Sequence, residues 1–137
     1  MNIPDCFYRV SVKALVLNET KDKFLVCQED NGRWELPGGG LDFGQSVADE
    51  MKREIKEEMG LEVKRMADNP CYFITAKMTR SEGWCVNVLF EVELVSLDFT
   101  PSNECQAIRF INKTDLPEIE VFSTVTDLAN MFNPKNH

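Results

Sequence analysis

The sequence predicts an α/β domain with a mixed β-sheet packed between helices. Segments rich in β-branched and aromatic residues occur on both sides of a segment whose apolar residues recur at helical spacing, and a second such helical segment follows near the end. There is no linker, low-complexity tract or internal repeat between them. With 137 residues the chain is long enough to bury its own core, so we expect a single domain over residues 1–137.

The strand-like segments are residues 7–17, 23–28, 71–78, 84–95 and 107–111. In the segment 84–95, alternation places every second side chain from Trp84 to Leu94 on one face. A short segment at 33–36 leads into Pro37-Gly38-Gly39-Gly40. This tract predicts a loop, because proline ends regular strand pairing and glycine permits backbone conformations that are closed to other residues.

The clearest helix is predicted from Ser46 to Met59. Ser46 can cap its N-terminus with Asp49 at the capping-box position, and Gly60 supplies a stop signal. The apolar residues at helical spacing are Val47, Ala48, Met51, Ile55 and Met59. A closing helix is predicted over 123–132, where Val125, Leu128, Ala129 and Phe132 fall on one face.

The net charge of -8 and the pI near 4.7 disfavour several classes of partner. A chain this acidic repels polyanions, so nucleic-acid binding is not expected, and a phosphate ligand would need cations to mediate its binding. No apolar run is long enough to span a bilayer, so no membrane role is expected. No secretory signal is visible at the N-terminus, which makes the cytoplasm the expected location.

The cysteines and the single histidine narrow the possible chemistry. Cys6, Cys27, Cys71, Cys85 and Cys105 form no CxxC pair, and we expect them to be small buried hydrophobic residues of a protein from a reducing compartment. His137, the only histidine, is the last residue, where tails are commonly mobile. Proton transfer is therefore expected to fall mainly to carboxylates.

Four acids share one stripe of the predicted helix: Glu50, Glu54, Glu57 and Glu58. Like-charge pairs four residues apart each cost roughly 0.2–0.5 kcal/mol on an isolated helix, so a compensating charge is expected. Arg53 can reach Glu57 or Glu50, and a divalent cation can satisfy several carboxylates at once. Hard oxygen ligands favour Mg²⁺ or Mn²⁺. The alternative interpretation is an ordinary solvated, charge-rich helix face.

The context of these acids resembles a known motif. Residues 39–61 read GGLDFGQSVADEMKREIKEEMGL, and the residues that match at fixed offsets are Gly39, Arg53, Glu54, Ile55, Glu57, Glu58, Gly60 and Leu61. This pattern resembles the box of the Nudix hydrolase family (MutT-like), and the lead-in Trp34-Glu35-Leu36-Pro37-Gly38 is also similar to the family's. The resemblance implies a Nudix-type α/β/α sandwich with a mixed β-sheet between helices.

The resemblance also implies roles for particular residues. Glu54, Glu57 and Glu58, with the carbonyl of Gly39, would hold divalent ions, while Arg53 would orient the carboxylates. Glu104, in the loop before a late strand, is a candidate for a further metal ligand or general base, or else an ordinary loop glutamate. The resemblance implies a pyrophosphohydrolase activity, in which the metal would acidify a water, a carboxylate would take its proton, and the hydroxide would attack a phosphorus of the substrate.

The implied reaction is Mg²⁺-dependent hydrolysis of a diphosphate linkage in a nucleoside diphosphate derivative, releasing a nucleoside monophosphate and a phosphate-containing product. Ala76 and Met78 stand near the offsets where a proline or a tyrosine flags two of the family's substrate subclasses. The substrate therefore stays open between a nucleoside triphosphate and a nucleotide sugar, both small nucleotides. Family members often pair as dimers, so a homodimer is a further expectation from the resemblance.

One position departs from the pattern. Gln45 replaces the first glutamate of the box, which in the family mainly pairs with the box arginine, and we expect Gln45 to keep a hydrogen bond to Arg53 without the charge. This departure keeps open an alternative function, that of a catalytically weak Nudix-like module that binds a nucleotide or a protein. A third alternative is an acidic interaction domain whose helix matches the box by chance and binds no metal.

Several other residues are weaker candidates, each with a structural alternative. An aromatic that stacks on a base could be Trp34, Phe43, Tyr72 or Trp84, although an aromatic on a strand is more often a core residue. Phosphate contacts could come from Arg9, Lys13 or Arg33, for which a solvated surface role is the alternative. Asn87 could recognise a base edge or bond to neighbouring protein groups. Asp42 could contact an outer-shell water or shape its loop.

Overall fold

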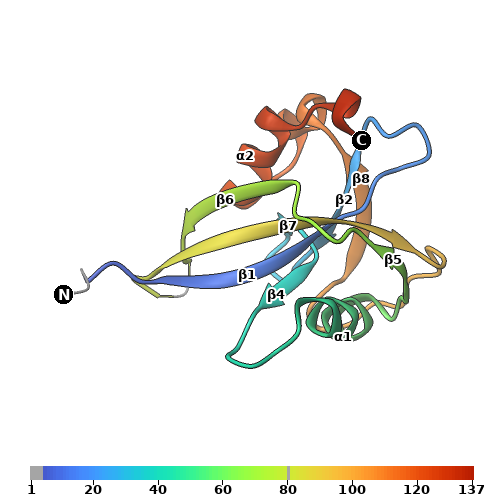
Figure 1. Cartoon of the computed structure of the whole chain (residues 1–137). Coiled ribbons are helices and arrows are strands. Elements are labelled where there is room, and N and C mark those ends of the chain that lie inside the picture. The colour runs from blue at the N-terminus through green and yellow to red at the C-terminus, as the bar shows by residue number, and fades with distance from the viewer. Residues whose placement is uncertain (1–4, 80) are drawn as a thin grey trace.

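The structure is a computed structural model that describes residues 5–79 and 81–137. Its strands are β1 Tyr8–Leu15, β2 Phe24–Gln28, β3 Trp34–Glu35, β4 Gly38–Gly40, β5 Val63–Met66, β6 Tyr72–Lys77, β7 Trp84–Leu94 and β8 Ala107–Ile111. Its helices are α1 Val47–Met59 and α2 Ser123–Met131, with short 3₁₀ helices η1 Lys113–Glu118 and η2 Pro134–Asn136 (Figure 1).

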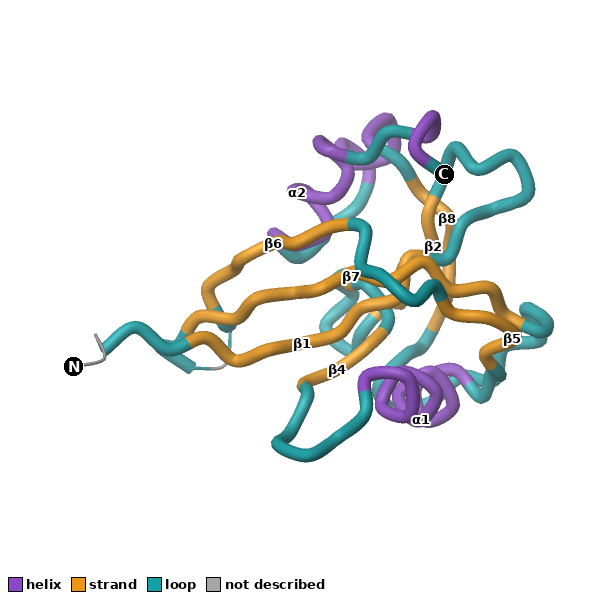
Figure 2. The backbone as a smooth tube through the Cα atoms, viewed as in Figure 1, coloured by secondary structure: helices purple, strands orange, loops and turns teal. Residues whose placement is uncertain are grey.

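The strands form two sheets. The larger one is five-stranded, with the order β4-β1-β7-β5 and with β6 also pairing with β7. β1 and β7 are parallel and the other pairs are antiparallel, so the sheet is mixed. The smaller, antiparallel sheet has the order β3-β2-β8. Figure 2 shows α1 and α2 on opposite sides of the larger sheet, which confirms the predicted fold class of a mixed sheet between helices.

α1 forms where the sequence predicts it. The Oγ of Ser46 accepts a hydrogen bond from the N–H of Asp49 at 3.3 Å, and Gly60 ends the helix in the left-handed region with φ of 67°. These are the contacts that satisfy free backbone groups at helix ends. α2 also matches its prediction to within one residue.

The prediction for the glycine tract was wrong. Residues Gly38–Gly40 form strand β4, which pairs antiparallel with β1, with Ser11 opposite Gly40. Glycine has low intrinsic strand propensity, but here the absence of side chains lets β4 lie close to neighbouring groups. β5 and the 3₁₀ helix η1 also have no predicted counterpart, because both are short and lack a clear period.

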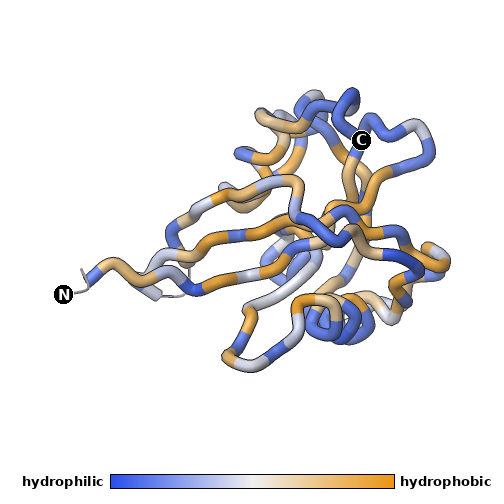
Figure 3. Tube along the Cα trace, in the orientation of Figure 1, coloured by the Kyte–Doolittle hydropathy of each residue, from blue (hydrophilic) through white to orange (hydrophobic). Residues whose placement is uncertain are grey.

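Two apolar clusters hold the layers together, one on each face of the larger sheet. On one face, Met51, Ile55 and Met59 of α1 are fully buried against even-numbered residues of β1 and β7. On the other face, Val125 and Leu128 of α2 pack in the second cluster, which also contains odd-numbered residues of these strands. β7 is therefore buried on both faces along its central part. Figure 3 colours most of this strand as hydrophobic.

The expectation for cysteine was only partly right. Cys27 and Cys105 are buried in the α1-side cluster, but Cys6 and Cys71 are exposed. Among the residues that the structure describes, no helix combines the length and apolar character needed to cross a membrane.

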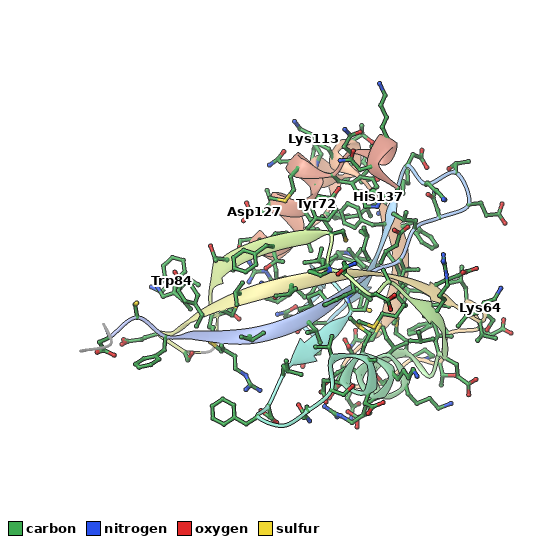
Figure 4. All side chains as sticks on the ribbon, viewed as in Figure 1. Lys64, Tyr72, Trp84, Lys113, Asp127 and His137 are labelled. Carbon is green, nitrogen blue, oxygen red and sulfur yellow. The ribbon has the colours of Figure 1, made fainter. Side chains whose placement is uncertain are left out.

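His137 packs against the body of the domain. Its imidazole Nε2 lies 2.9 Å from the hydroxyl of Tyr72, its ring stacks on Phe132, and its Nδ1 lies 3.5 Å from a carboxylate oxygen of Glu91. Figure 4 shows His137 and Tyr72 together beside α2.

Candidate functional site

Two of the predicted acids on α1 meet strand β4. The carboxylate of Glu58 accepts a hydrogen bond from the N–H of Gly38 at 2.9 Å. The carboxylate of Glu54, one turn earlier, lies so close to Gly39 that a Cβ at residue 39 would be 2.5 Å from it. A glycine is therefore required for this approach, since such a separation is shorter than any ordinary contact. The helix–strand pairing brings Gly39, Glu54 and Glu58 together, as the sequence predicts.

These acids line a cavity of about 340 Å³ between the two sheets. Its acidic lining residues are Glu29, Asp30, Glu35, Glu54, Glu58 and Glu104. Lys13 is the one basic residue among the described residues that line it. Glu104 thus lies beside the α1 acids, where the sequence places a further candidate ligand or base.

Glu57 has a different environment. Its side chain is 51% exposed, and its Oε2 accepts a hydrogen bond from Arg53 at 2.8 Å. Within the described residues, no three His, Cys, Asp or Glu side chains form a ready-made metal site. Glu54 and Glu58 both line the cavity, whereas Glu57 is not among its described lining residues and pairs with Arg53.

The cavity destabilises negative charge. Burial raises the pKa of Glu58 to about 8, and Lys13 and the hydrogen bond from Gly38 only partly oppose this effect. Burial likewise raises the pKa of Glu54, against the opposing charge of Arg53, and burial raises the pKa of Glu35. Two carboxyls four residues apart on α1 therefore lack sufficient positive charge near them. A divalent cation satisfies such a pair, and carboxylate oxygens are the donors that Mg²⁺ prefers.

Arg53 is held by three acids of its own helix. Its Nε donates to Glu50 at 3.2 Å, and its other nitrogens bond to Glu57 and to Glu54, the latter at 2.9 Å. Glu50 is only 3% exposed and is bonded by two nitrogens of the guanidinium. The predicted reach of Arg53 to Glu50 and Glu57 is confirmed. These carboxylates raise the pKa of Arg53, with Glu50 as the main cause.

The prediction for Gln45 was wrong. Its Oε1 accepts a hydrogen bond from the backbone N–H of Asp42 at 2.7 Å, so its described contact stabilises the loop before α1 and does not involve Arg53. Glu50, one turn into the helix, supplies a charged partner for the arginine instead. Helix spacing had already placed Glu50 within reach of Arg53, and only the contact that the resemblance implied for residue 45 is not formed.

The aromatic candidates for base stacking lie outside the cavity. Trp34, Phe43, Tyr72 and Trp84 are all absent from the residues that line it. Tyr72 bonds to His137, and Figure 4 shows Trp84 near the end of the sheet where β7 begins.

The three basic candidates for phosphate contact lie in different environments. Lys13 lines the cavity and donates to the carbonyl of Leu36 at 3.4 Å. Arg9 pairs with Asp42 at 2.8 Å, which gives Asp42 a role in shaping its loop. Arg33 lies 4.7 Å from the ring centre of Phe122. Only Lys13 is therefore placed to meet a ligand of the acidic cavity.

Asn87 bonds to neighbouring protein groups, which was the alternative to recognition of a base edge. Its side chain is 3% exposed, and its Nδ2 donates to the carbonyl of Ile74 and to the hydroxyl of Thr124, both at 3.3 Å. These bonds connect β7 to β6 and α2. Asn87 therefore satisfies a polar position inside the core.

Comparison with known proteins agrees with this arrangement. The NUDIX domain model matches residues 7–129. Nucleoside triphosphatase NudI of Escherichia fergusonii is 26% identical over 126 residues, covering 82% of this chain and 88% of that protein. An RNA pyrophosphohydrolase of Ruthia magnifica is 35% identical over 60 residues, but the match covers 44% of this chain and only 34% of that relative.

Solved structures show the same fold. The MutT protein from Methanosarcina mazei Go1 has a TM-score of 0.78 at 23% identity, with 98% of this chain and 99% of that chain covered. The E. coli ORF135 protein has a TM-score of 0.72 at 16% identity, with 95% and 91% covered. Because the domain model spans most of the sequence, the chain belongs to the Nudix hydrolase family as a MutT-like member.

Proposed function

We propose that this protein is a Mg²⁺-dependent pyrophosphohydrolase that cleaves a diphosphate linkage in a small nucleotide, releasing a nucleoside monophosphate and a phosphate-containing product. The observation that carries the proposal is the pair Glu54 and Glu58, held against β4 in a cavity that burial makes unfavourable for their charges. A cation that neutralises both carboxylates would offset this cost.

The proposed ligands are Glu54, Glu57 and Glu58 of α1, the carbonyl of Gly39 and Glu104. Bound Mg²⁺ would supply charge neutralisation on the phosphoryl oxygens and would acidify a water; Mn²⁺ could replace it. Of these ligands, Glu57 is held by Arg53, so its carboxylate would turn from the guanidinium toward the cavity when the ion binds.

The position of each side chain in the site suggests its role. Arg53, anchored by buried Glu50, orients Glu54 and Glu57. Glu104 lines the same cavity from a separate loop, where it would accept the proton of the attacking water. Lys13, the basic residue of the cavity wall, is placed to contact a phosphate oxygen.

A nucleoside triphosphate is the favoured substrate, with a nucleotide sugar as the other choice. The NudI relative, named as a nucleoside triphosphatase, aligns with most of this chain, and a relative from Bacillus subtilis is named a putative 8-oxo-dGTP diphosphatase. The name of the Ruthia relative points to RNA, but a net charge of -8 disfavours a polyanion.

The test is a panel of nucleoside triphosphates, nucleotide sugars, ADP-ribose and dinucleoside polyphosphates incubated with Mg²⁺ or with EDTA, with the products identified by ³¹P NMR. Glu57→Gln is compared with Glu62→Gln, which makes the same chemical change at an exposed acid just beyond α1. We expect Glu57→Gln to lose at least 10²-fold in kcat, whereas Glu62→Gln retains wild-type activity. Both variants are expected to remain folded, because both side chains are exposed.

Two outcomes would contradict the proposal. One is equal turnover by Glu57→Gln and the wild-type protein. The other is nucleotide binding by the wild-type protein without hydrolysis of any substrate in the panel, which would establish the alternative of a binding module.

A further inference from the structure

The loop 41–46 connects β4 to α1 (Figure 1), and the side chain of Arg9 on β1 holds its first part. The guanidinium of Arg9 donates to the carbonyl of Leu41 at 3.1 Å and pairs with the carboxylate of Asp42 at 2.8 Å. It also lies against Gly40, because the heavy atoms that a Cβ at residue 40 would meet first all belong to this guanidinium. Arg9 therefore contacts three consecutive residues where β4 ends and the loop begins.

Hydrogen bonds within the loop extend this contact to α1. The N–H of Asp42 donates to Oε1 of Gln45 at 2.7 Å, and the N–H of Gln45 donates to the carbonyl of Asp42 at 3.2 Å. The next residue, Ser46, caps the helix by accepting a hydrogen bond from the N–H of Asp49. A continuous series of contacts therefore runs from β1 through Asp42 and Gln45 to the first turn of α1.

This series of contacts joins the two elements that carry the proposed metal ligands. Gly39 lies in β4 directly before Gly40, and the carboxylate of Glu54 on α1 lies so close to Gly39 that a Cβ there would clash with it. The loop is the covalent connection between these two elements, so its shape helps to set the separation of Gly39 from Glu54. Metal affinity depends on how accurately surrounding groups hold the ligands.

Global stability is not the main effect expected of Arg9. Its side chain is 44% exposed and that of Asp42 is 67% exposed, and ion pairs this open to water contribute little to the free energy of unfolding. The same contacts still restrict the conformations of the loop. Because their loss should leave the protein folded, an effect of Arg9 on the geometry of the site can be measured separately from stability.

We propose that Arg9 is a positioning residue for the metal site: it holds the loop 41–46 so that Gly39 of β4 and Glu54 of α1 stay at the separation that a divalent ion requires. The inference rests on the proposed function, because it concerns the same Mg²⁺ site. It also gives Gln45 a role that does not involve Arg53, since its side chain fastens Asp42 to the end of the loop.

The test measures Mn²⁺ affinity by electron paramagnetic resonance in the wild-type protein, Arg9→Ala, Gly40→Ala and the double variant. Gly40→Ala places a Cβ where the guanidinium lies. We expect the dissociation constant for Mn²⁺ to rise at least about 5-fold in each single variant. The double variant should bind Mn²⁺ no more weakly than Arg9→Ala, because both changes act on one contact. The control, Arg65→Ala, removes an exposed arginine that pairs with Glu93 and should match the wild-type protein.

Three further readouts separate positioning from other roles of Arg9. In the metal-free protein, the amide hydrogen of Asp42 should exchange at least about 5-fold faster in Arg9→Ala than in the wild-type protein. The midpoint of urea unfolding should stay close to the wild-type value, and Arg9→Gln serves where Arg9→Ala does not fold. At saturating Mg²⁺, the KM for a nucleoside triphosphate should stay within about 2-fold of the wild-type value.

The outcomes distinguish this inference from the proposed function. Unchanged Mn²⁺ affinity in Arg9→Ala, while the wild-type protein binds Mn²⁺ and hydrolyses a nucleotide, would overturn the inference alone. A higher KM without a change in Mn²⁺ affinity would also overturn it and would return Arg9 to the phosphate contact that the sequence allows. A wild-type protein that neither binds Mn²⁺ nor hydrolyses a nucleotide would overturn the proposed function, and this inference with it.

Discussion

Replacing Glu58 with glutamine isolates the cost of placing a negative charge beside β4. In the metal-free protein, burial raises the pKa of Glu58 from 4.5 to about 8. Glutamine has nearly the same shape, and its Oε1 can still accept the hydrogen bond from the N–H of Gly38. The substitution therefore removes the titrating group and keeps the packing and the backbone contact.

The magnitude follows from the pKa difference between the unfolded and folded states. Each pKa unit corresponds to about 1.4 kcal/mol, so at pH 7 the folded state must either protonate Glu58 or bury its charge, at a cost of about 3 kcal/mol. Because the folded pKa is raised, the stabilising contribution of Glu58 is fully present below pH 4.5. It is lost as the pH rises toward about 8. Glutamine has no such dependence.

The assay is urea unfolding of the wild-type protein and Glu58→Gln in EDTA at several values between pH 5 and pH 8. The free energy of unfolding of the wild-type protein should fall by about 3 kcal/mol relative to the variant across this range. Saturating Mg²⁺ should raise the free energy of unfolding of the wild-type protein at pH 8 by more than that of Glu58→Gln, because the variant lacks one of the ionised carboxylates that would bind the cation. Parallel pH curves for the two proteins in EDTA would refute the reasoning.

Three further predictions concern the same site and the core. Gly39→Ala places a Cβ against the carboxylate of Glu54 and should weaken Mn²⁺ binding, followed by electron paramagnetic resonance, at least about 10-fold with little loss of stability; unchanged affinity would contradict the close approach. Glu50→Gln should reduce kcat about 10–100-fold, whereas Gln45→Glu should change it by less than about 3-fold; a large gain from Gln45→Glu would restore the original assignment of residue 45. Asn87→Ala should lower the free energy of urea unfolding by about 1–3 kcal/mol without changing KM, and a change in KM would indicate ligand contact.

Local patterns in the sequence predicted the elements that have a strong period or a strong end signal. α1 follows from apolar residues at helical spacing, from the cap at Ser46 and from the stop at Gly60, and the structure has all three features. β4 could not be predicted in this way. A strand of three glycines has no side-chain pattern, and it exists because β1 pairs with it.

The sequence predicted which residues form the candidate site, but only some of the contacts between them. The spacing of Glu54 and Glu58 placed both on one helix face. The resemblance added Gly39, which lies against the carboxylate of Glu54, and Glu104, which lines the same cavity as both acids. Helix spacing correctly predicted that Arg53 reaches Glu50 and Glu57, whereas the contact to Gln45 that the resemblance implied is not formed. Tertiary pairing decides which of several possible partners a long side chain meets.

The exposure of Trp84 at one end of the larger sheet was not predicted. Alternation along β7 correctly placed Trp84 on the same face as Phe90, but it could not show that α1 covers only one of them. Coverage depends on the length and position of the helix relative to the strands. A sequence pattern gives the face of a side chain, and the packing of layers determines whether that face meets solvent.

The most direct measurement for the proposed metal site is anomalous diffraction from crystals of the protein grown or soaked with Mn²⁺. The proposal predicts a strong anomalous peak coordinated by carboxylate oxygens of Glu54 and Glu58 and by the carbonyl of Gly39, and loss of that peak in Glu54→Gln crystals. The absence of a peak in this cavity at saturating Mn²⁺, or a peak coordinated elsewhere, would contradict it.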